Sequence, residues 1–251
     1  MKINRKQALR KMAMGTAGAW VLPQIAGEVK AGSSHVFDRN DPGLQEADMA
    51  SLWRNSALII VDMQNDFVRA GAPLEVPAAR DTIRNQKELI GAFRKRNLPV
   101  VFTKFISHPH YYLLWNWSPQ CKPPTKCCWK GHQRSYQDIS GSRDCSEIID
   151  ELQPDKQDNI IEKFGYGAFH DTPLAKILQA SGFSSVVITG TVTQICVEET
   201  AREAFHHGFR TTIVEDAVSS FAEDLHVATL KNFSMKFGWV AKSDMILSKL
   251  A

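Results

Sequence analysis

Ala57-Leu-Ile-Ile-Val-Asp62 decides the fold, because it places five apolar residues in a row and ends them with a carboxylate. A short, continuous apolar run is typical of a strand that is buried on both faces of a parallel sheet. Similar runs recur along the chain and predict five further strands, at residues 99–104, 159–163, 185–190, 210–214 and 238–240.

Segments with the apolar spacing of helices separate these strands, at residues 78–95, 172–181, 194–207 and 223–235. This alternation predicts an α/β fold: a doubly wound, mostly parallel sheet of about six strands with helices on both faces, in a Rossmann-like arrangement of three layers. Residues 106–145 follow neither pattern and are rich in Cys, His, Pro and aromatic side chains. An irregular segment of this length inside a compact fold is usually functional.

Composition places the chain among ordinary globular proteins. Of its 251 residues, 43% are hydrophobic and 23% are charged, which excludes wholesale disorder and coiled-coil or collagen-like architectures. The formal charge of +3 first suggests an acidic partner. However, residues 1–31 hold six basic residues and one acid, and the remainder of the chain is slightly acidic. We therefore expect no nucleic-acid partner.

The N-terminal segment has the organisation of an export signal. A basic start is followed by a short apolar run, rich in Gly and Ala, at residues 12–22, and by small residues that end near Ala31. Asn4-Arg-Lys-Gln-Ala-Leu-Arg10 resembles a twin-arginine signal with Lys in place of the second Arg. We expect residues 1–31 to direct export to the periplasm or beyond, without a stable membrane anchor, and residues 32–251 to form the functional domain. The alternative is an amphipathic N-terminal helix of a cytoplasmic protein.

Three chemically complementary side chains stand at ends of predicted strands, where open α/β sheets place their chemistry. They are Asp62, Lys163 and Cys196, the last in the first turn of a helix. A partly buried carboxylate can act as a general acid or base. The helix dipole and a nearby ammonium are expected to lower the pKa of the Cys196 thiol and produce a thiolate nucleophile. Spacing alone leaves open a structural role, with Cys196 as a small buried side chain.

The segments around these residues resemble three ordered motifs of the isochorismatase-like cysteine hydrolase superfamily, at residues 57–67, 162–174 and 190–202. The resemblance covers roughly residues 50–245. It implies that Asp62 is the catalytic acid–base, Lys163 the catalytic lysine and Cys196 the nucleophile.

The resemblance also implies an oxyanion hole made by the backbone N–H groups of Val192 and Cys196, with a cis peptide bond at Thr191–Val192. The expected activity is hydrolysis of a C–N bond in a small amide, ureide or carbamoyl compound through an acyl-enzyme. Residues 232–240 are similar to the ureidoacrylate amidohydrolase branch. Homo-oligomers are common in the superfamily and are expected here. The alternative function is a non-catalytic or redox-responsive protein that binds a small molecule.

Aromatic and amide side chains are candidates to bind the substrate: Phe67, Trp115, Tyr166 and Gln194. Nicotinamidases of this superfamily carry an Asp-x-His metal motif after the second strand, where this chain reads Lys104-Phe-Ile-Ser107. We therefore expect no catalytic metal and no cofactor. Zinc bound by His108 and His110 is a minor alternative.

The remaining cysteines, Cys121, Cys127, Cys128 and Cys145, all lie in the irregular segment. In an oxidising compartment, four cysteines are expected to form two disulfides, with Cys127 and Cys128 each pairing outward. Sequence does not reveal the connectivity. A zinc site made by the four thiolates is the alternative.

Overall fold

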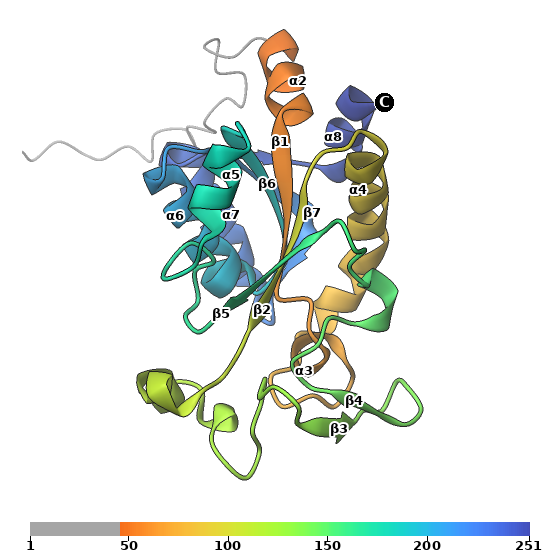
Figure 1. Ribbon diagram of the computed structural model, residues 1–251, viewed down its shortest axis with the longest axis vertical. Helices are drawn as coiled ribbons and strands as arrows, with labels where there is room; N and C mark the ends of the chain where they lie inside the picture. The colour runs from red at the N-terminus through yellow and green to blue at the C-terminus, as the bar shows by residue number, and fades with distance from the viewer. Residues whose placement is uncertain (1–45) are drawn as a thin grey trace, which may run out of the picture. The chain divides into compact units, whose positions relative to one another are not determined.

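The computed structural model describes residues 46–251, so the expected export signal lies outside the described residues. Its centre is a sheet of six parallel strands in the order β5-β2-β1-β6-β7-β8 (Figure 1). The predicted α/β fold is thereby confirmed. The strands are β1 (Ser56–Val61), β2 (Val100–Phe105), β5 (Asn159–Lys163), β6 (Ser185–Thr191), β7 (Arg210–Ser219) and β8 (Trp239–Ala241). Only β7 differs much from its predicted range, since it continues five residues further.

Helices cover both faces of the sheet (Figure 1). Alternate residues of β1 point to opposite faces, so that Leu58 and Ile60 belong to one apolar core and Ile59 and Val61 to the other. The first core is closed by α2 (Glu46–Arg54), α4 (Ile83–Lys95) and α8 (Ser243–Leu250), and the second by α5 (Leu174–Ala180), α6 (Glu198–His206) and α7 (Glu223–Lys236). The sequence did not predict α2 and α8, which lie before the first strand and after the last one. The start of the predicted 78–95 helix is a 3₁₀ segment, η1 (Pro77–Thr82).

The order of the strands determines where a site can form. The chain runs from β1 outward to β2 and β5, then returns to place β6 on the other side of β1. The carboxyl ends of β1 and β6 therefore meet where the winding direction reverses, which is the usual ligand crevice of open α/β sheets.

The segment 106–145 is irregular but well anchored. It contains two 3₁₀ turns, η2 (Pro109–Asn116) and η3 (Pro119–Cys121), and an antiparallel hairpin of β3 (Gln133–Ser135) and β4 (Ser142–Asp144). Asp66, a fully buried residue of α3 (Asn65–Val68), holds this segment. Its carboxylate accepts hydrogen bonds from Arg134 Nε at 2.8 Å, the Tyr136 hydroxyl at 2.8 Å and the Cys128 N–H at 2.9 Å. These contacts join residues more than 60 positions apart and leave no periodic pattern in the sequence, so the anchoring by Asp66 was not predicted.

The expectation of two disulfides in this segment is wrong for the structure, in which all four cysteines are buried thiols. The expected outward pairing of Cys127 and Cys128 with Cys121 and Cys145 is therefore not formed, and the sulfur atoms of Cys127 and Cys128 lie 3.7 Å apart. The Cys145 thiol instead contacts the backbone carbonyls of Trp129 at 3.3 Å and Lys126 at 3.6 Å. Within residues 46–251, no helix is long and apolar enough to cross a membrane.

Candidate active site

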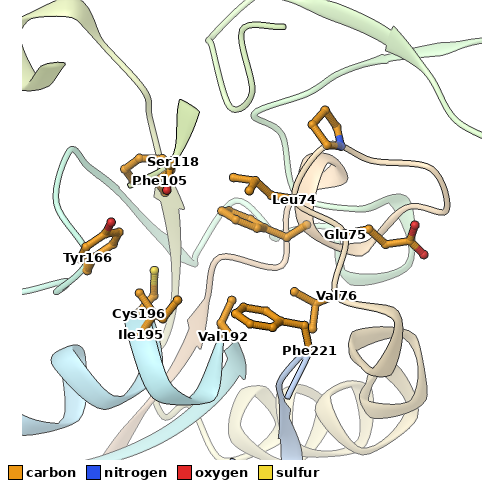
Figure 2. A pocket seen from close by; sticks show the side chains of 12 residues that line it. Leu74, Glu75, Val76, Phe105, Ser118, Tyr166, Val192, Ile195, Cys196 and Phe221 are labelled. Atoms are coloured by element: carbon orange, nitrogen blue, oxygen red, sulfur yellow. The ribbon is translucent and has the colours of Figure 1, made fainter. Parts of the chain in front are cut away.

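Cys196 follows β6 in a turn of unusual geometry. The peptide bond Thr191–Val192 is cis, as predicted. The next residues, Thr193–Val197, form a π-helical turn, η5, before α6 begins at Glu198. The predicted regular helix over 194–207 is therefore wrong in its first turn. Cys196 itself is 4% exposed, and its side chain faces a cavity above the sheet (Figure 2).

Asp62 and Lys163 form a buried ion pair beside this cysteine. Lys163 Nζ lies 2.8 Å from Asp62 Oδ2, and both side chains are 0% exposed. The same ammonium donates to the backbone carbonyls of Tyr166 at 2.7 Å and Gly165 at 3.1 Å. Both Asp62 and Lys163 interact with the Cys196 thiol. The structure thus brings the three predicted residues together at the carboxyl ends of β1, β5 and β6.

The pKa of the Cys196 thiol differs from the sequence prediction. Burial raises this pKa to about 12; the Lys163 ammonium opposes the shift and the Asp62 carboxylate adds to it. The predicted lowering is therefore wrong, because the loss of solvent outweighs the neighbouring cation. Burial also disfavours the charge of Lys163, but Asp62 and Cys196 outweigh it and keep the pKa of the ammonium above its ordinary value. In the free protein, Cys196 is thus a thiol beside a ready proton acceptor.

Sequence reasoning missed two buried polar side chains near the carboxyl end of β1, and one of them, Thr103, contacts Asp62. The Thr103 hydroxyl on β2 donates to Asp62 Oδ1 at 2.6 Å and accepts from the Asp62 backbone N–H at 3.1 Å. Gln64 is fully buried and donates to the carbonyls of Phe105 at 3.0 Å and Ser146 at 2.8 Å. The signal for both was a polar residue inside an apolar strand or within three residues of its end, since buried polar groups need specific partners.

The cavity at Cys196 has a volume of about 260 Å³. Two candidate substrate residues, Phe67 and Tyr166, belong to its lining, and Figure 2 shows the Tyr166 ring close to the cysteine. The other lining residues are Pro73, Leu74, Glu75, Val76, Phe105, Ser118, Val192, Ile195 and Phe221. The wall is therefore mostly apolar, and among the described residues no Lys, Arg or His lines it. Its single acid, Glu75, is paired with Arg80 at 2.9 Å.

The other two candidates lie elsewhere. Trp115 is outside the cavity lining: its Nε1 donates to the Ser107 hydroxyl at 3.0 Å, and its ring stacks on Trp129. Gln194 lines an adjoining polar cavity that shares Tyr166 and Ile195 with the first one. Both polar atoms of its carboxamide are buried and, within residues 46–251, have no hydrogen-bond partner. Because buried polar groups usually have a hydrogen-bond partner, the Gln194 carboxamide is a candidate to bind a polar ligand.

The family profile described as the isochorismatase domain matches residues 56–245. The chain belongs to the isochorismatase family. This range includes every strand of the central sheet and all three residues of the Asp62–Lys163–Cys196 cluster. The resemblance inferred from the three motifs is thereby confirmed.

Several proteins similar to this chain are named as enzymes that hydrolyse amides. Nicotinamidase 3 of Arabidopsis thaliana is 33% identical, over 78% of this chain and 88% of its own length. Ureidoacrylate amidohydrolase of Yersinia enterocolitica is 32% identical, over 78% of this chain and 89% of its own. The solved structure of N-carbamoylsarcosine amidase from Thermoplasma acidophilum has a TM-score of 0.61 and 31% identity, and covers 76% of this chain and 97% of its own. The predicted enzyme class, hydrolases of non-peptide C–N bonds, is confirmed at this level.

Proposed function

We propose that this protein is a cysteine-dependent amidohydrolase of a small, neutral amide. The observation that carries the proposal is a buried thiol in contact with a carboxylate–ammonium pair at the wall of a small apolar cavity. A nucleophile, a proton acceptor and a fixed positive charge at one point are the parts that acyl transfer needs.

The geometry supports a two-stage reaction. As Cys196 attacks the carbonyl carbon, its proton passes to the Asp62 carboxylate, which Thr103 and Lys163 hold in place. Backbone N–H groups of Val192 and Cys196 are proposed to stabilise the oxyanion. Asp62 then gives the proton to the leaving nitrogen, and the C–N bond breaks to leave a thioester on Cys196. Water, deprotonated by Asp62, hydrolyses the thioester and restores the thiol.

Replacing Cys196 by alanine tests this proposal. Ammonia release from nicotinamide, benzamide and N-carbamoylsarcosine is measured for both proteins, and kcat is expected to fall by at least about 10³-fold, because alanine cannot form the acyl-enzyme proposed at this position. Cys145→Ser is the matched control: this buried cysteine contacts neither the ion pair nor the cavity lining and should keep its activity. Turnover that survives Cys196→Ala would exclude a cysteine nucleophile. Binding without turnover in wild type would favour the alternative, a non-catalytic or redox-responsive protein.

The charge of the substrate is a second prediction. A cavity without a described cation in its lining, and with Glu75 already in it, disfavours a carboxylate on the substrate. Its volume of about 260 Å³ is below the usual range for drug-sized ligands, about 300–1,000 Å³, so the substrate should be small. We further propose that the unpaired Gln194 carboxamide binds a polar group of the substrate.

A matched pair of compounds measures this preference. N-Carbamoylsarcosine and its methyl ester share the scissile C–N bond and differ in one negative charge. The ester is expected to have a kcat/KM for ammonia release at least about tenfold higher, which corresponds to about 1.4 kcal/mol. Preference for the free acid would show that a cation reaches the substrate and would contradict the neutral-amide proposal.

We also propose that the protein is exported and that it self-associates. Residues 1–31 are proposed to direct export, which periplasmic fractionation of the full chain against a chain lacking them would test. A homo-oligomer is consistent with exposed apolar side chains on and near α7, namely Phe205, Phe221, Leu225, Val227 and Met235. Light scattering during size-exclusion chromatography would refute this proposal if it gave the mass of one chain.

A further inference from the structure

A second cluster of nucleophilic side chains lies beside the active site and takes no part in the proposed reaction. Cys121, Cys127 and Cys128 are each 0% exposed, as is Asp66. The Cys127 and Cys128 sulfur atoms are 3.7 Å apart, and a carboxylate oxygen of Asp66 lies within 4.8 Å of both. Cys121 lies at the edge of this group of three: its thiol interacts with that of Cys127, which makes it the candidate for a fourth ligand.

Neighbouring cysteines usually point apart, but the chain turns sharply at this place. Cys128 has a φ of +55°, in the left-handed region that residues other than glycine seldom adopt. With the chain turned in this way, both sulfur atoms reach the same buried point. The adjacency of the two cysteines, which in sequence disfavours a tetrahedral site, is thus overcome by the backbone.

The spacing of the sulfur atoms matches a thiolate-bound metal. Two thiolates at about 2.3 Å from a tetrahedral zinc ion are separated by about 3.8 Å, close to the observed 3.7 Å. The carboxylate of Asp66 is already oriented by Arg134, Tyr136 and the Cys128 N–H. Such hydrogen-bonded support of a ligand is the usual arrangement around protein metal sites.

We propose that Cys121, Cys127, Cys128 and Asp66 bind one structural zinc ion. Soft thiolates select zinc among the abundant divalent cations, and a set of four ligands closes the site as in structural zinc centres. Binding of Zn²⁺ displaces the three thiol protons to solvent, and Arg134 at 2.8 Å from Asp66 offsets part of the resulting negative charge. Cys145 is outside the ligand set: its thiol contacts two backbone carbonyls and interacts with Asp66, but it does not belong to the group of ligand atoms that lie within 4.8 Å of one another.

The ion would join two walls of the substrate cavity. Asp66 directly precedes Phe67, and Cys121 follows Ser118 by three residues; both Phe67 and Ser118 line the cavity at Cys196. These walls come from segments that lie far apart in the sequence. Zinc would therefore hold the irregular segment against α3 and stabilise the shape of the cavity without taking part in the reaction.

The first experiment measures zinc in the untagged full chain after dialysis with zinc and a thiol reductant. Elemental analysis is expected to find about one zinc per chain, since a closed site retains its ion. The variants Cys127→Ser and Cys128→Ser should lose the ion, whereas Cys196→Ser, which removes a buried cysteine outside the ligand set, should keep it. Zinc retained in the first two variants, or lost in the Cys196→Ser control, would overturn the assignment.

A second measurement does not depend on whether a variant folds. Wild-type protein reconstituted with Co²⁺ should show thiolate-to-cobalt charge transfer and tetrahedral d–d absorption, with an intensity appropriate to three thiolates. Less than about 0.2 zinc per chain and no such absorption would refute the site. Intact mass without reductant identifies the competing state: a protein lighter by four hydrogens and free of zinc has two disulfides instead, and the proposal fails.

Discussion

Lys163→Met is expected to lower the free energy of unfolding by about 3–5 kcal/mol and to abolish turnover. The methionine has a similar length but leaves the Asp62 carboxylate, which is 0% exposed, without its cation 2.8 Å away. The loss of stability comes from an uncompensated buried charge, and the loss of turnover from the missing positive charge at the nucleophile. Urea denaturation and ammonia release measure the two effects separately.

The double variant Asp62→Asn/Lys163→Met separates the structural effect from the chemical one. With both charges removed, most of the lost stability is expected to return, because neutral side chains of similar volume often replace a buried ion pair at little cost. Activity should stay absent, since the asparagine carboxamide in place of the carboxylate cannot take the proton of Cys196. A single Lys163→Met variant as stable as wild type would show that the pair is not a buried ion pair. An active double variant would refute the proton transfer through Asp62.

Gly190→Ala is expected to destabilise the fold by more than about 3 kcal/mol and to reduce activity strongly. Gly190 lies at the carboxyl end of β6 with a φ of +107°, which disfavours any residue with a Cβ. An added Cβ would overlap the backbone carbonyl of Val61 and lie 2.6 Å from its nitrogen. Because Asp62 follows Val61 directly, relief of this overlap must move the carboxylate relative to Cys196. Thermal unfolding and kcat measure both consequences.

Gly182→Ala is the control for backbone conformation. Gly182 also has a positive φ, +80°, but an added Cβ there meets nothing within 4 Å. Gly182→Ala should therefore lower the free energy of unfolding by about 1–2 kcal/mol, which is the cost of the left-handed backbone conformation alone, and should leave kcat unchanged. Equal losses for the two variants would contradict the view that close contact between β1 and β6 limits position 190.

The sheet could be predicted because its signals are local. Each strand is a short apolar run such as Ala57–Val61, and each crossover helix that was predicted carries its own apolar stripe. The helices α2 and α8 were missed because they lie before the first strand and after the last one, where no strand–helix alternation points to them. Thr103, the polar partner of the Asp62 carboxylate, and the buried Gln64 were missed because their bonds join segments that lie far apart in the sequence.

The sequence by itself determined the α/β topology, the order of the three motifs and the three reactive side chains at strand ends. Only the tertiary structure decided the protonation of Cys196, because burial is a property of the surrounding chain and here outweighs the nearby ammonium. Tertiary structure likewise placed Trp115 outside the cavity lining and left the carboxamide of Gln194 without a partner among the described residues. It also gathered Cys127, Cys128 and Asp66 at one buried point, with the Cys121 thiol next to that of Cys127. These features depend on contacts between residues far apart in the chain, which no local pattern of residue types encodes.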